Sequence, residues 1–377
     1  MKKKILFVTG TRADFGKIKS LIASVHASTQ FEEYVYVCGM HLLDKFGATY
    51  EEVLKEKYKN IFVAYDSIVS ENMSINLSEV TKSLTGYVLR VKPDMIVVHG
   101  DRTDALAGAI VGALNNIKVA HIEGGELSGT IDESIRHAIS KFAHFHFVCN
   151  AEAKKRLIQL GEEESRIYVI GSPDIDIMMS DALPSLESAR KRYGIGFGNY
   201  GILMYHPVTT ETALLKNNIA NVVSAVLESG KNMIVIYPNN DSGCQIILNE
   251  YSRFEGKKNI KVFPSLRFEY FLVLLKNAEF IMGNSSAGIR ESGIYGVPSI
   301  DLGTRQSGRY SVTVADNIQH VNEVKKDVLF AISETDKFKK SSFIFGEGNS
   351  TEKFMSVINE SEFWNKEIQK HFVDRGI

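Results

Sequence analysis

Acidic side chains follow two apolar runs in the first half of the chain, where buried strands would end. Asp101 comes shortly after Met95–Val98, and Glu123 directly follows Val119–Ile122 and precedes two glycines. The carboxyl ends of parallel strands meet at one edge of a sheet, which is where ligands bind. Carboxylates gathered there can transfer protons to and from carbon or oxygen. The pattern therefore predicts an acid–base site that includes Asp101, Glu123 and Asp132, the last on a predicted helix.

Structural roles compete with this interpretation at several positions. Asp104 is explained as a cap of the helix that starts beside it. N-capping is also open to Asp132, and its spacing from Arg136 permits an i,i+4 salt bridge within one helix. Neither role explains the neighbouring Asp101 and Arg102, because burying such a pair in a cleft without a function would be costly.

A glycine-rich turn follows the first apolar run, Ile5–Val8, and opens a helix. In this segment, Gly10–Asp14, backbone N–H groups and the helix dipole could bind phosphate, and Arg12 would add a cation. An ordinary strand-to-helix turn with a solvated arginine is equally compatible with the pattern. The segment lacks the GxGxxG spacing, so it does not support a dinucleotide site.

The second half of the chain carries a serine pair at the start of an expected helix, Ser286–Ile294. The hydroxyls of Ser285 and Ser286, with the helix N-terminal amides, would suit a diphosphate. Glu291 could then accept hydrogen bonds from ribose hydroxyls. The competing interpretation is a serine N-cap, with Glu291 paired to Arg290 or to another surface base.

Histidine and arginine residues mark further strand ends. A lone histidine is more often structural than catalytic, but His206 is held at a strand end by the following Pro207, which strengthens the case for a functional role. Arg305 follows a later strand and could contact phosphates. His144 and His146 would share one face of a strand. Because no carboxylate or third ligand stands at metal spacing from them, we interpret both as packing residues.

The elements that must position these residues alternate along the whole chain. Short apolar runs are separated by helical stretches such as Asn76–Val91, which predicts α/β architecture with parallel, doubly wound sheets. The alternation restarts near residue 172, so we expect an N-terminal domain over 1–172 and a second over 173–377. The stretch Ser350–Val373 is expected to be helical and to cross back onto the first domain.

Composition narrows the class of protein. The chain has 377 residues, 44% of them hydrophobic, with 44 Lys plus Arg against 45 Asp plus Glu. This balance argues against nucleic-acid or membrane-surface partners, which favour a basic excess. Three scattered cysteines form neither a disulfide framework nor a zinc site and suit a reducing cytoplasm. We find no signal peptide and no apolar stretch long enough for a membrane span.

Five ordered runs together resemble a known family. They are GTRADFGK, VHGDRTDALA, HIEGGELSGTIDESIRHAISK, YHPVT and GNSSAGIRESGIYGVPSIDLGTRQ. These runs closely resemble the UDP-N-acetylglucosamine 2-epimerase family over nearly the whole chain. They are most similar to its hydrolysing branch, found in bacterial sialic acid synthesis and as one domain of the animal bifunctional enzyme.

The resemblance implies a fold and a set of site residues. Two Rossmann-like domains in the glycosyltransferase-B arrangement would enclose the active site, with UDP held mainly by the second domain. Asp101, Glu123 and Asp132 match the catalytic carboxylates, and His206, near the diphosphate, is counted with them. The residues implied in nucleotide-sugar binding are Arg12, Arg102, Asn239, Ser285, Ser286, Gly288, Glu291 and Arg305.

The implied reaction converts UDP-N-acetylglucosamine and water to UDP and N-acetylmannosamine, the first step of sialic acid synthesis. Elimination of UDP would give 2-acetamidoglucal, which water then hydrates. No cofactor and no metal are required, and the family suggests a homodimer or homotetramer. Alternatives are a UDP- or GDP-diacetylbacillosamine substrate, a non-hydrolysing epimerase, a glycosyltransferase of the same architecture, and a nucleotide-sugar sensor without catalysis.

Overall fold

The computed structural model describes residues 2–70, 72–310 and 316–374 and divides into two compact units. The first unit contains Met1–Glu126, Asp132–Met179 and Ile344–Ile377. The second contains Leu127–Ile131 and Ser180–Phe343. Residues 173–179 thus belong to the first unit, whereas the sequence pattern predicts a boundary near residue 172. The C-terminal segment also belongs to the first unit, onto which the sequence pattern expects Ser350–Val373 to cross back. In the described part of the chain, no helix is long and apolar enough to cross a bilayer.

The first unit is a seven-stranded sheet in the order β3-β2-β1-β4-β5-β6-β7, and all neighbouring strands are parallel. Its strands are β1 (Lys3–Thr9), β2 (Phe31–Val37), β3 (Ile61–Val63), β4 (Met95–His99), β5 (Lys118–Ile122), β6 (Phe145–Val148) and β7 (Ile167–Val169). Its helices are α1 (Arg12–Ala27), α2 (Tyr50–Lys55), α3 (Met73–Val91), α4 (Thr103–Leu114), α5 (Ile131–Phe142), α6 (Ala151–Gln159), α7 (Pro173–Met178), α14 (Ser350–Asn359) and α15 (Ser361–Asn365).

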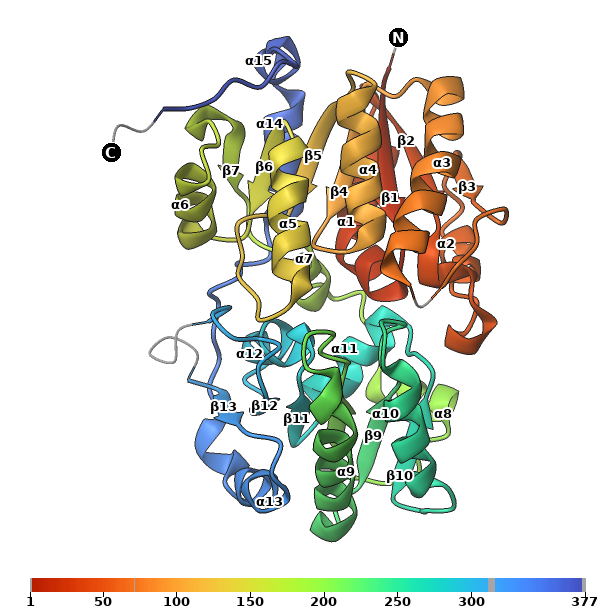
Figure 1. The fold of residues 1–377 in the computed structure, drawn as a ribbon, viewed down its shortest axis with the longest axis vertical. Coiled ribbons are helices and arrows are strands. Elements are labelled where there is room, and N and C mark those ends of the chain that lie inside the picture. Colours follow the sequence, from red (N-terminus) through yellow and green to blue (C-terminus); the bar gives the residue numbers. More distant parts are fainter. Residues whose placement is uncertain (1, 71, 311–315, 375–377) are drawn as a thin grey trace. The chain divides into compact units, whose positions relative to one another are not determined.

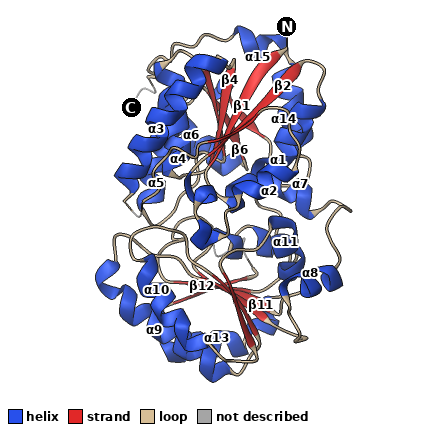
Figure 2. Cartoon of the chain, turned by 90° about the vertical axis from the view of Figure 1, so that its right-hand side faces the viewer, coloured by secondary structure: helices blue, strands red, loops and turns tan. Residues whose placement is uncertain are grey.

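Helices cover both faces of this sheet, as Figures 1 and 2 show. Helices α3, α4 and α5 lie on one face, and α1, α7 and α14 lie on the other. The alternating side chains of each central strand are shared between the two layers. In β1, Leu6 and Val8 belong to the core under α3 and α4, whereas Ile5 and Phe7 belong to the core under α1 and α14.

The second unit is a six-stranded sheet in the order β10-β9-β8-β11-β12-β13, again parallel throughout. Its strands are β8 (Gly201–Met204), β9 (Met233–Ile236), β10 (Ile260–Phe263), β11 (Phe280–Gly283), β12 (Ser299–Leu302) and β13 (Ile318–Val321). Its helices are α8 (Leu186–Tyr193), α9 (Thr212–Ser229), α10 (Cys244–Tyr251), α11 (Phe268–Lys276), α12 (Glu291–Ile294) and α13 (Lys325–Ser333). The predicted α/β class with two doubly wound parallel sheets is confirmed.

Strand order reverses once in each sheet, between β1 and β4 in the first and between β8 and β11 in the second. Connections leave in opposite directions at such a point, so the loops beyond the strand ends diverge and leave room for a ligand. The loops of Arg12 and Asp101 flank this point in the first unit. Those of His206 and Ser285 flank it in the second.

Two helical predictions are wrong. The expected helix Ser286–Ile294 is a single 3-10 turn, Ser286–Gly288, followed by the four-residue α12. Gly288 explains part of the break, because it lies where a Cβ would meet the Ser299 hydroxyl at 2.7 Å, and glycine also weakens a helix. The macrodipole invoked for diphosphate binding is therefore largely lost.

The expected helix Ser350–Val373 is also interrupted. The backbone is extended at Glu360, α15 ends at Asn365, and no described residue beyond it is helical. The bend brings Phe363, which is 1% exposed, into the first unit's core, where its ring centroid lies 4.1 Å from that of Phe145. Burial of this aromatic ring outweighs the continuation of the helix.

Candidate functional site

Asp101 follows β4 and is held by a buried cation on α5. The Arg136 guanidinium forms an ion pair with the Asp101 carboxylate, and its other terminal nitrogen donates to the Glu126 carbonyl at 3.0 Å. Arg136 is 1% exposed. Its guanidinium thus links α5 to two strand-end loops, a wider role than the intrahelical pairing that its spacing from Asp132 permits. Asp132 itself lies partly exposed in the first turn of α5.

Glu123 occupies a strained position at the end of β5. Its φ is 64°, which is uncommon for a residue with a side chain, and its N–H donates to the Phe147 carbonyl at 2.9 Å. The side chain is buried and its carboxylate lies 3.1 Å from Nε2 of His99. Strain of this kind costs about 1–3 kcal/mol and persists where the surroundings dictate it, often at active sites.

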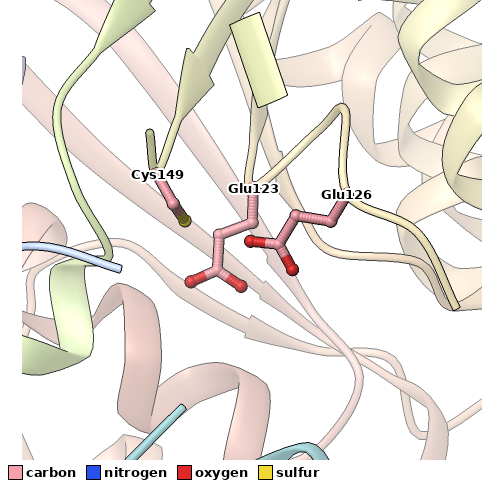
Figure 3. A group of neighbouring side chains, drawn as sticks. All are labelled: Glu123, Glu126 and Cys149. Carbon is pink, nitrogen blue, oxygen red and sulfur yellow. The ribbon is translucent and has the colours of Figure 1, made fainter. Parts of the chain in front are cut away.

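Glu126 and Cys149 lie beside Glu123, as Figure 3 shows. Their ligand atoms all fall within 4.8 Å of one another, the one such group among the described residues. Two carboxylates and a thiol mix hard and soft ligands, which leaves zinc as the main candidate metal. Glu123, however, is already engaged by His99 and by the Ser172 hydroxyl. Because Glu123 already has these protein partners, we interpret the group as two buried carboxylates and a thiol packed together, and not as a metal site.

His99 lies between two carboxylates, and its side chain is 9% exposed. Its Nδ1 lies 2.7 Å from Oδ1 of Asp14, on the opposite side of the ring from Glu123. Burial lowers the pKa of His99, but Glu123 and Asp14 outweigh this effect and raise it to about 9. His99 is therefore a cation at neutral pH.

His121 points to the next loop and is kept neutral. Its Nε2–H donates to the Gly100 carbonyl at 2.8 Å, and Nδ1 lies 3.0 Å from the Ser140 hydroxyl. Burial lowers the pKa of His121 to about 3. The ring thus fixes the backbone just before Asp101.

We expect the free energy of unfolding of the first unit to fall as the pH drops from 7 to 5. Burial lowers the pKa values of His41, His121 and His144 to about 4, 3 and 4. These groups stay neutral when folded but take up protons near pH 6.5 when unfolded, so their stabilisation is lost below pH 6.5. Each should cost about 2 kcal/mol at pH 5.

Urea unfolding followed by the fluorescence of Trp364 tests this prediction. Trp364 is the one tryptophan of the sequence, and it packs against the core of the first unit. His144 accepts a hydrogen bond from the Val119 N–H, which a glutamine oxygen can also accept. His144→Gln should therefore show a shallower pH dependence, and a wild-type stability that stays constant between pH 7 and 5 would contradict the prediction.

The Gly10 turn is organised around carboxylates. The Gly10 N–H donates to Asp14 at 3.2 Å, and a Cβ at Gly10 would lie 2.0 Å from Oδ2 of Asp104. Asp104 is thus packed beneath this turn. It lies inside α4, whose N-cap is Arg102, so the capping role predicted for Asp104 is wrong. The backbone N–H of Gly10 is used within the protein, which weakens the phosphate interpretation of this turn.

The arginines expected beside the substrate each lie near a carboxylate. Arg12 is the first residue of α1 and lies 3.9 Å from Glu52, and Arg102 Nε lies 3.9 Å from Asp104. Both are partly buried.

In the second unit, His206 is fixed in one tautomer. Nδ1 accepts a hydrogen bond from the Asn239 N–H at 3.1 Å, so a neutral ring carries its proton on Nε2. Asn284 holds the same backbone from both sides, accepting from the His206 N–H at 2.7 Å and donating to its carbonyl at 2.9 Å. The strand ends of β8, β9 and β11 are thereby joined.

Two further predicted binding residues, Arg305 and Ser285, lie beside Asn284, and a third, Glu291, is buried. Arg305 donates to the Asn284 carbonyl at 3.2 Å, and Ser285 caps the 3-10 turn through a bond from the Ala287 N–H at 3.4 Å. Glu291 is 2% exposed and Arg290 is 3% exposed. Arg290 is therefore not the surface base that the sequence pattern suggests as a partner of Glu291.

A glycine before Asn284 makes this approach possible. Gly283 has φ 127°, and a Cβ there would lie 1.9 Å from the Met204 carbonyl oxygen. Any other residue would push β11 away from β8 and displace Asn284.

The sequence pattern indicates Asp101 and Glu123 but not the groups that hold Glu123. His99 and Asp14 stand inside the family-like runs without an assigned role, and Ser172 lies at the predicted domain boundary. Their signal is position. His99 and Ser172 lie at or just beyond a strand's carboxyl end, and Asp14 lies in the first turn of the helix after β1.

Comparison with known proteins places the chain in a family. A model of the UDP-N-acetylglucosamine 2-epimerase family matches residues 23–359. The UDP-N-acetylglucosamine 2-epimerase of Neisseria meningitidis serogroup B is 48% identical over 380 residues, covering 100% of both chains. A UDP-N,N'-diacetylbacillosamine 2-epimerase (hydrolyzing) of Legionella pneumophila is 32% identical over 364 residues, covering 95% of this chain and 96% of that protein.

The fold agrees with this placement. The crystal structure of a UDP-GlcNAc 2-epimerase from Neisseria meningitidis bound to UDP-GlcNAc matches with a TM-score of 0.81 at 18% identity. The match covers 94% of this chain and 99% of that one. The chain belongs to the UDP-N-acetylglucosamine 2-epimerase family.

Proposed function

We propose that this protein is a hydrolysing 2-epimerase that converts UDP-N-acetylglucosamine and water to UDP and N-acetylmannosamine. A base removes the proton from C2 while the C1–O bond to UDP breaks, which gives 2-acetamidoglucal and UDP. Water then adds to C1, and a proton is delivered to C2 from the opposite face. Each proton transfer requires a positioned acid or base.

The observation that carries the proposal is the set of three carboxylates in the first unit, Asp101, Glu123 and Asp132. Glu123 is strained, buried and faced by the cationic His99, and Asp101 is paired with a buried arginine. Such expensive local arrangements are typical of catalytic groups. We assign these carboxylates, shared between base, acid and water-orienting roles, to the two proton transfers.

UDP binding is assigned mainly to the second unit. His206 carries its proton on Nε2 and would stabilise the departing diphosphate, together with Arg305 and the two serine hydroxyls. Arg12 and Arg102 would add positive charge from the first unit. The full proposed set in the second unit is Asn239, Ser285, Ser286, Gly288, Glu291 and Arg305.

Two comparisons support the finer assignments. The relative at 48% identity is called a UDP-N-acetylglucosamine 2-epimerase, and the one at 32% is called hydrolyzing but takes a diacetylbacillosamine nucleotide. The higher identity favours N-acetylglucosamine as the sugar, and the second name favours hydrolysis. The protein would then supply N-acetylmannosamine for sialic acid synthesis as a cytoplasmic homodimer or homotetramer.

A panel of nucleotide sugars tests the proposal. UDP-N-acetylglucosamine, UDP-N,N'-diacetylbacillosamine and UDP-glucose are each incubated with the protein without an acceptor, and free UDP is measured. We expect UDP release from UDP-N-acetylglucosamine, and none from UDP-glucose, which lacks the acetamido group. Release only with an added sugar acceptor would indicate a glycosyltransferase, and UDP-N-acetylmannosamine without free UDP would indicate a non-hydrolysing epimerase.

A further inference from the structure

Glu123 is approached on one side by a histidine held from α1. Asp14, in the first turn of α1, lies 2.7 Å from Nδ1 of His99, and Nε2 of His99 lies 3.1 Å from Oε2 of Glu123. The other carboxylate oxygen, Oε1, is bonded by the Ser172 hydroxyl. The two oxygens of Glu123 thus face different groups.

A second chain of contacts leads from Ser172 back to the same helix. The Ser172 hydroxyl also contacts Oδ1 of Asp174, and Oδ2 of Asp174 lies 3.3 Å from Nζ of Lys17. Ser172 and Asp174 are almost fully buried, and Lys17 is 7% exposed.

Both series of contacts end on α1, where positions 14 and 17 lie one turn apart on the same helical face. We call this set the Glu123 ring: Asp14, Lys17, His99, Glu123, Ser172 and Asp174. Five of its six members are ionisable. Burying several charges stabilises a fold poorly, because the cost of desolvating them offsets most of the attraction between opposite charges. A functional reason for the ring is therefore required.

Proton counting gives that reason. The Ser172 hydroxyl has one hydrogen and two carboxylate neighbours, so it can donate to only one of them at a time. Lys17 neutralises Asp174, which leaves the hydroxyl hydrogen for Oε1 of Glu123. The His99 cation faces Oε2. Both oxygens are then oriented, and the ionised form of Glu123 is favoured.

We propose that Asp14, Lys17, His99, Ser172 and Asp174 are positioning residues that hold Glu123 as an oriented carboxylate base, with α1 closing the ring. This inference rests on the proposed function of Glu123 as a catalytic group. Arg12 begins the same helix. The residue assigned to phosphate binding and the residue that orients His99 toward Glu123 therefore lie on one rigid element.

Four variants test the ring, with kcat, UDP affinity by calorimetry and thermal unfolding measured for each. His99→Asn keeps a donor toward Asp14 but withdraws it from Glu123, and should lower kcat about 100-fold while the Kd for UDP stays within about threefold. His99→Gln can still reach Glu123 and should recover part of that loss. Lys17→Met should lower kcat about 10-fold, because the Ser172 hydrogen then turns to Asp174.

Lys19→Met is the matched control. Lys19 lies on the same helix and pairs at 2.6 Å with Glu56, which is not a member of the ring, so kcat should not change. The ring is overturned if the wild type releases UDP from a nucleotide sugar and both His99→Asn and Lys17→Met keep kcat within about twofold of it.

A second measurement separates failure of the ring from failure of the proposed function. An inactive wild type would overturn the proposed function. Nitrogen NMR of histidine-labelled protein at pH 7.5 would still report on the ring. His99 should be cationic in the wild type, and its pKa should fall in Asp14→Asn, because one of its two carboxylate neighbours is lost. A neutral His99 imidazole in the wild type would overturn the inference.

Discussion

Glu123→Gln should lower kcat by about 10²- to 10⁴-fold, because a general base contributes this much to a proton transfer. The Kd for UDP should stay within about threefold of the wild-type value. The amide keeps the shape of the side chain but cannot accept a proton from C2. UDP binding should persist, since the residues assigned to it lie mainly in the second unit. Initial rates of UDP release and calorimetric titration with UDP measure the two effects separately.

Glu133→Gln provides the control. Glu133 is a partly exposed carboxylate on α5 that pairs with His137 at 3.6 Å within the helix. Its loss should leave kcat and UDP affinity unchanged, because exposed pairs contribute little. Full activity of Glu123→Gln would remove Glu123 from the catalytic set. Equal losses of kcat and of UDP affinity would instead point to general disruption of the fold.

Arg136→Met should destabilise the first unit by about 3 kcal/mol, the scale at which a broken buried ion pair affects stability. The Asp101 carboxylate loses its cation, and the Glu126 carbonyl loses a donor. Urea unfolding followed by Trp364 fluorescence reports on this unit, because that side chain packs against the first unit's core. We also expect kcat to fall, since Asp101 is no longer held.

Lys155→Met serves as the comparison in the same unit. Lys155 pairs with Glu152 at 2.9 Å, and both side chains are largely exposed, at 68% and 63%. Breaking this pair should change the free energy of unfolding by less than about 0.5 kcal/mol. If Arg136→Met were no more destabilising than Lys155→Met, Arg136 would not be the structural centre of the Asp101 loop.

Strands are the elements that the sequence predicts best, because their signal is local. The runs Met95–Val98 and Val119–Ile122 are buried, so they are largely apolar, and both are strands whose bounds lie within one residue of the predicted ones. The positions at the carboxyl ends of strands follow from that pattern alone. This is why the residue pattern is sufficient to indicate Asp101 and Glu123 as candidate site residues.

The wrong predictions concern places where tertiary contacts outweigh local pattern. Ser286–Ile294 has helical character, but close packing against Ser299 admits only glycine at position 288, and glycine weakens a helix. Phe363 bends the C-terminal segment to reach the core. Asp104 has the sequence position of a cap yet lies beneath the Gly10 turn.

The Glu123 ring could not be predicted for a related reason. Its members come from four separate segments, and contacts between such segments leave no periodic trace in the sequence. Lys17 illustrates this, since a lysine inside a helix is usually solvated, and only the structure places its Nζ 3.3 Å from the buried Asp174.

Proton NMR of the products formed from UDP-N-acetylglucosamine in deuterated water tests the central claim most directly. Elimination and hydration predict free UDP and N-acetylmannosamine with deuterium at C2, because the proton delivered to that carbon comes from solvent. Free UDP with N-acetylglucosamine or with no C2 deuterium would contradict the mechanism. UDP-N-acetylmannosamine without free UDP would contradict hydrolysis.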